Sequence, residues 1–102
     1  MLTQQQRQLI LSGAIQKVSV KDFGLRGRAE VYLLDSACVW LITRSSRFLG
    51  KDAETFVTIL EAASTHEERP LTGCILIEKA PVCSKARRWL EDKDISLETL
   101  YS

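Results

Sequence analysis

Long apolar runs are missing from this chain of 102 residues, in which the longest such run, 37–42, has six residues. A membrane-spanning helix needs about 20 apolar residues, so we expect none. Charge of one sign is missing too, since 14 Lys and Arg face 13 Asp and Glu for a net charge of +1. This balance excludes a strongly basic nucleic-acid coat and an acidic tail. The glutamine-rich start lacks the apolar core of a secretory signal, so we expect a cytoplasmic protein with no membrane partner.

Cysteine and histidine are scarce, with three cysteines and one histidine. Cys38, Cys74 and Cys83 form no CxxC pair, and their odd number does not suit a disulfide scaffold. A zinc site needs four protein ligands, or three and a water, but His66 lies far from any spaced pair of thiols. We therefore expect no metal and no cofactor, and we predict that the thiols are free and mostly buried.

Motifs for phosphate-loop binding and for nucleophilic catalysis are also absent. The segment 24–27 (GLRG) matches neither common glycine-rich phosphate loop. A single histidine in a loop supplies no nucleophile–base pair held by a third group. The segment around Cys83 is similar to the strand-to-helix turn of glutaredoxin-like redox proteins, but Ala80 stands where the attacking thiol belongs. Whether the chain is an enzyme stays uncertain, and we lean against it.

Hydrophobic periodicity predicts one domain over residues 1–102. Thr3 and Gln6 form a capping box that opens a helix ending near Gly13. Three strands follow at 14–23, 28–34 and 38–43, then a helix at 53–65 with Asp52 as its cap. A buried strand at 74–77, a helix from Pro81 to Asp94 and a strand at 95–100 complete the chain. The order α-β-β-β-α-β-α-β predicts an α/β (α+β) domain, with a mixed sheet of about five strands flanked by three helices.

The predicted core lies between the last helix and the buried strand. Trp89 and Leu90 fall on the inner stripe of that helix, and Ile75 and Ile77 belong to the strand.

The element order, with the short motifs at 28–34 (RAEVYLL), 40–44 (WLITR), 73–77 (GCILI), 85–87 (KAR) and 95–97 (ISL), is similar to restriction-endonuclease-like proteins. These form the PD-(D/E)XK superfamily, and the second half looks particularly like Mrr-like domains. The resemblance covers about residues 14–100. It implies a divalent cation held between an Asp on the second strand and an acidic residue or Gln on the third, with a lysine two positions on.

The same resemblance implies a degenerate active site. Glu30 stands where the first carboxylate belongs and Arg44 where the lysine belongs, but Ile42 offers no oxygen. A metal-dependent nuclease whose missing carboxylate comes from elsewhere, such as Asp22 or Asp35, is one alternative. Because Ile42 cannot ligate a hard cation, we expect no metal-dependent cleavage. The alternative for Glu30 and Arg44 is a pair of solvated strand residues with no special role.

Basic residues gather in three places, and ordinary surface charge is the alternative explanation for each of them. They lie around the last helix (Lys79, Lys85, Arg87, Arg88), after the third strand (Arg44, Arg47, Lys51) and around the first turn (Lys17, Lys21, Arg26, Arg28). Several cations on one face suffice for phosphate contacts. The sequence therefore favours a non-catalytic, nuclease-like binding module, accessory to DNA processing or to a mobile element, that contacts DNA or a DNA-processing protein. A homodimer is possible. A protein interaction or inhibitor domain without a nucleic-acid role is the alternative.

Overall fold

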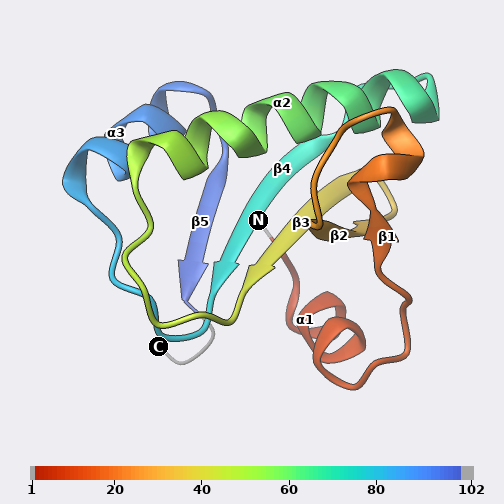
Figure 1. Cartoon of the computed structure of the whole chain (residues 1–102). Helices are drawn as coiled ribbons and strands as arrows, with labels where there is room; N and C mark the ends of the chain where they lie inside the picture. The colour runs from red at the N-terminus through yellow and green to blue at the C-terminus, as the bar shows by residue number, and fades with distance from the viewer. Residues whose placement is uncertain (1, 100–102) are drawn as a thin grey trace.

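A five-stranded mixed sheet separates two layers of helices in the computed structural model, which describes residues 2–99 (Figure 1). The elements are α1 (Gln4–Leu11), β1 (Val18–Ser19), the 3-10 turn η1 (Val20–Phe23), β2 (Glu30–Leu34), β3 (Ala37–Ile42), α2 (Gly50–Glu67), β4 (Thr72–Ile77), α3 (Ser84–Asp92) and β5 (Ser96–Thr99). The predicted α/β (α+β) class, its three helices and the order α-β-β-β-α-β-α-β are confirmed.

The strands lie in the sheet in chain order, β1-β2-β3-β4-β5. The first three form an antiparallel meander, whereas β3, β4 and β5 are mutually parallel. Parallel neighbours need long crossover connections, and α2 and α3 supply them. The carboxyl ends of β3 and β4 therefore meet at one edge of the sheet, where the loops into α2 and α3 begin.

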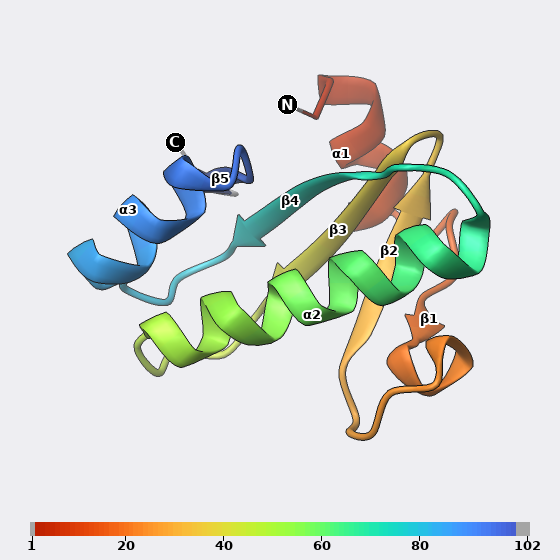
Figure 2. The ribbon, with the colours of Figure 1, turned by 90° about the horizontal axis from the view of Figure 1, so that it is seen from above.

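Each face of the sheet has its own core. Helices α2 and α3 cover one face and α1 covers the other (Figure 2). The larger cluster, beneath α2 and α3, includes Phe56, Ile75 and Leu90, all without exposed surface. The smaller cluster, beneath α1, includes Ile10 and Leu76. Strand β4 is buried on both faces, which explains its uninterrupted apolar run.

Gly73 allows α2 to lie directly on β4. A Cβ atom at this position would come within 2.9 Å of side-chain carbons of both Leu60 and Phe56 in α2. A larger residue would force the Leu60 and Phe56 side chains to shift, so close packing of α2 on β4 favours glycine here.

The first predicted strand, 14–23, is wrong in extent. Only Val18 and Ser19 pair with β2. The Ser19 hydroxyl accepts a hydrogen bond from the Lys21 backbone N–H, which starts η1, and Gly24 closes the turn with φ of 84°. A serine that binds the backbone two residues on favours a turn over a strand, although valines alternate through the segment.

Both later helices begin at residues other than those predicted. Asp52 is not the N-cap of α2: it lies in the first turn and accepts the Leu49 backbone N–H at 2.7 Å. Pro81 is not in α3, because its carbonyl accepts the Phe48 N–H and keeps residue 81 outside the helix. Cys83 is the N-cap instead, and its sulfur accepts the Ala86 N–H at 3.3 Å.

The predicted core is confirmed except at one residue. Leu90 and Ile75 have no exposed surface and Ile77 has 2%, but Trp89 is only half-buried. Helix α3 ends at Asp92 rather than Asp94, and the predicted end of the last strand, Leu100, lies outside the described residues. Within residues 2–99, no helix is long and apolar enough to cross a membrane.

Candidate nucleic-acid interface

Two loops lie side by side where β3 and β4 end, as Figure 1 shows at the lower left. Phe48 in one loop and Val82 in the other form a parallel β-bridge. The Phe48 N–H donates to the Pro81 carbonyl at 2.8 Å, and the Cys83 N–H donates to the Phe48 carbonyl at 3.0 Å. Phe48 is fully buried, so the bridge is anchored in the core. This connection brings the starts of α2 and α3 together.

Four exposed cations belong to this edge: Arg47, Lys51, Lys79 and Lys85. Lys51 and Lys85 line the same hollow of about 240 Å³ between α2 and α3, together with Gly50, Glu54 and Trp89. None of the four forms an ion pair with an acid within residues 2–99. Positive charge that is not neutralised by the protein can contact phosphate.

Arg44 is at the same edge but already has a partner. Its guanidinium pairs with the Asp52 carboxylate at 2.8 Å and lies over the Phe48 ring, 5.8 Å from the centroid. Since Asp52 also accepts the Leu49 N–H, Arg44 helps to hold the first turn of α2. Its main role is therefore structural, in contrast to the exposed lysines beside it.

The three basic residues of α3 do not share one face. At about 100° per residue, Arg87 lies about 200° around the helix from Lys85, whereas Arg88 lies within about 60° of it. Lys85 faces the hollow beside α2, and Arg87 lies on the other side of the helix. Lys85 and Arg88 can therefore contact one extended ligand, and Arg87 cannot join them.

Glu30, Asp35 and Arg44, the degenerate-site candidates, do not converge in one cleft. Asp35 lies in the β2–β3 turn, about 16 Å along β2 from Glu30, and accepts the Gln6 side-chain amide at 3.1 Å. Arg44 is at the Glu30 end of the hairpin but on the other face: Ile42, two residues before it, is buried beneath α2. Two residues after Glu30, Tyr32 packs beneath α1.

A hollow of about 220 Å³ lies beside Glu30. Its lining contains two cations, Lys17 and Arg28, but no second carboxylate. Asp22, the other candidate for a missing ligand, lies in η1 and is exposed. Across residues 2–99, no three His, Cys, Asp or Glu side chains gather as metal ligands would.

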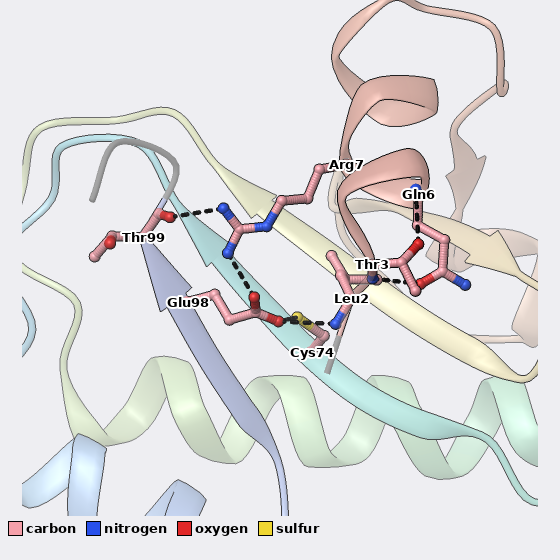
Figure 3. A network of polar contacts seen from close by, with 7 residues as sticks. All are labelled: Leu2, Thr3, Gln6, Arg7, Cys74, Glu98 and Thr99. Carbon is pink, nitrogen blue, oxygen red and sulfur yellow. Dashed lines mark hydrogen bonds and ion pairs between the residues drawn. The ribbon is translucent and has the colours of Figure 1, made fainter.

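A polar network on the α1 face of the sheet was not predicted from the sequence (Figure 3). Glu98 of β5 accepts the Arg7 guanidinium at 2.5 Å, the Leu2 N–H at 3.0 Å and the Cys74 thiol at 3.5 Å. Burial acts to raise the pKa of Glu98, but these hydrogen bonds outweigh burial and hold that pKa below its usual value. The network fastens α1 to the far end of the chain. The sequence does not single Glu98 out, because with Ser96 it takes the polar positions of an ordinary apolar/polar alternation.

The thiols are free within the described chain, as predicted. Burial raises the pKa of Cys38 to about 12. It raises the pKa of Cys74 to about 12 as well, and the neighbouring Glu98 carboxylate adds to the effect. Cys83 is half-buried and serves α3 as its cap. Because the thiolate is the reactive form, Cys38 and Cys74 are poor nucleophiles.

We compared the chain with known protein families, curated proteins and solved structures. No family model, no curated protein and no solved structure gives a significant match to the chain. What defines the protein is its α/β (α+β) fold and the basic edge at the ends of β3 and β4.

Proposed function

We propose that the protein is a non-catalytic, nuclease-like binding module that contacts DNA through the edge carrying Arg47, Lys51, Lys79 and Lys85. The observation that carries the proposal is the hollow shared by Lys51 and Lys85, two exposed cations from different helices. The Phe48–Val82 bridge fixes the two loops that lead into those helices. The bridge therefore keeps the backbone of the two helix starts together, so that their lysines can contact phosphates of one strand.

The missing catalytic geometry supports a binding role. Glu30 and Arg44 lie on opposite faces of the sheet, and Glu30 is the one carboxylate that lines its hollow, together with the cations Lys17 and Arg28. A hard divalent cation needs several oxygen ligands converging on one point. We therefore propose an accessory role in DNA processing or in a mobile element, with no cleavage by this chain itself.

Binding of labelled duplex and single-stranded DNA at low salt tests this function. We expect weak retention that does not depend on sequence, and no cutting of either substrate with Mg²⁺ or Mn²⁺. Absence of retention at low salt would overturn the DNA-binding proposal. Metal-dependent cleavage that disappears in Glu30→Ala would overturn the non-catalytic part.

A protein partner without nucleic acid is the second candidate, and α1 favours it. Leu9 and Leu11 of this short helix are 37% and 53% exposed, so neither is used in the core. The two lie about 200° apart around the helix, so each leaves apolar surface on a different side of α1 that a protein partner can cover. This candidate is favoured if the wild-type protein does not bind DNA and if substitution of Leu9 and Leu11 changes its oligomeric state. A homodimer is its simplest form.

A further inference from the structure

Trp89 of α3 lies at the margin of the larger core and is partly buried against it. Ala86 and Leu90 of the same helix point into the core and have no exposed surface, whereas Trp89 is half-buried. It follows Lys85 by four residues, so the two side chains are neighbours on one face of α3. Both line the hollow that also contains Lys51 of α2.

We propose that this hollow holds one unpaired base of a single-stranded nucleic acid against Trp89, while Lys51 and Lys85 contact the phosphates beside it. The inference rests on the proposed function and names its substrate class. A hollow of about 240 Å³ is smaller than the pockets that enclose drug-sized ligands, and it suits a single flat ring system. Aromatic stacking and flanking cations are the two features by which proteins bind single strands without sequence preference.

Duplex DNA does not satisfy this arrangement, because its bases are paired and stacked on one another. A duplex presents only phosphates to the lysines, so the Trp89 indole has no unpaired base on which to stack. The Lys93 ammonium lies over the Trp89 ring at 5.5 Å from its centroid but does not line the hollow, so a bound base has to stack on ring surface that Lys93 leaves open. Single strands should therefore bind more tightly than duplex at equal salt.

Tryptophan fluorescence tests the inference directly. The chain has two tryptophans, and Trp40, which is partly buried as well, packs against Phe48 and Phe56 away from this hollow. In a Trp40→Phe variant that keeps its fold, the emission reports Trp89 alone. We expect a short thymine oligonucleotide to quench it in a saturable manner, and the matching duplex to quench it little.

Substitution of the indole supplies the second measurement. Trp89→Leu should weaken single-strand binding by about 5- to 150-fold, the range expected for loss of one stacked base. Trp89→Phe, which keeps an aromatic face, should lose less, and duplex affinity should change little in either variant. Circular dichroism confirms that each variant is folded.

The outcomes separate this inference from the proposed function. Equal affinity for single strands and duplex, with no quenching of Trp89, would overturn the inference and leave DNA binding through the lysines intact. Failure of wild-type protein to bind either form would overturn the proposed function.

Discussion

Phe48 and Val82 join the two loops at the carboxyl ends of β3 and β4 through a parallel β-bridge. The Phe48 ring is fully buried, stands edge-on to Trp40 and lies beneath the Arg44 guanidinium. One side chain thus anchors the core and the edge that carries the candidate interface.

Phe48→Ala should lower the free energy of unfolding by about 3–5 kcal/mol, because it leaves a cavity beneath both loops. Urea denaturation measures the change. Its neighbour provides the control: Leu49 is 38% exposed, and Leu49→Ala should cost about 1 kcal/mol, clearly less than Phe48→Ala. Similar losses in the two variants would mean that Phe48 does not anchor the edge.

The Glu98 network predicts a dependence of stability on acid pH. Because the pKa of Glu98 is lowered by folding, its contribution is complete above the usual glutamate value of about 4.3 and is lost as the pH falls through the folded value. Glu98→Gln should be less stable than wild type at neutral pH, and the difference should shrink on acidification. Thermal unfolding across this range measures it.

Glu61→Gln is the matched control for the pH experiment, since Glu61 lies on the exposed side of α2. Its stability should follow that of wild type at every pH. A Glu98→Gln variant that does the same would show that the network does not fasten α1 to β5.

Cys83 predicts opposite results for two small substitutions. Its sulfur caps α3 by accepting the Ala86 N–H at 3.3 Å. Serine is a preferred N-cap, so Cys83→Ser should keep or improve stability, whereas Cys83→Ala should cost about 0.5–2 kcal/mol. Melting temperatures of the two variants test this, and equal losses would show that packing of the sulfur matters more than capping.

Glu54 is the one acid in the lining of the hollow between α2 and α3. Its carboxylate repels phosphate, so Glu54→Gln should strengthen DNA binding at low salt and leave the fold unchanged. Glu61→Gln, which makes the same change in net charge farther along α2, is the control. Equal gains in both variants would mean that only the total charge matters.

Element types and order were predictable from the sequence because the apolar pattern is strong. The apolar, β-branched and aromatic content of β2 and the continuous apolar run in β4 leave little choice, and the Thr3–Gln6 capping box is present in the structure. Boundaries were less predictable where tertiary contacts decide them. Pro81 suits a first helical turn locally, but its carbonyl is committed to Phe48, which lies 33 positions earlier.

The candidate site was predictable only in part. Lys51 and Lys85 were both noted as surface cations, but their meeting at one hollow depends on how α2 packs beside α3. Glu30 and Arg44, which the resemblance placed in one degenerate site, lie apart for a related reason. Their places at one end of a hairpin follow from the sequence, whereas the face each side chain occupies depends on strand register.

The salt dependence of DNA binding tests the central claim most directly. Lys51→Ala/Lys85→Ala and Lys17→Ala/Lys21→Ala remove the same charge, the first pair from the proposed interface and the second from the β1 end of the sheet. The slope of log affinity against log salt should become less steep in the first variant only, by the amount expected for the loss of up to about two phosphate contacts. Equal slopes in both variants, or an unchanged slope in the first, would contradict a DNA interface at this edge.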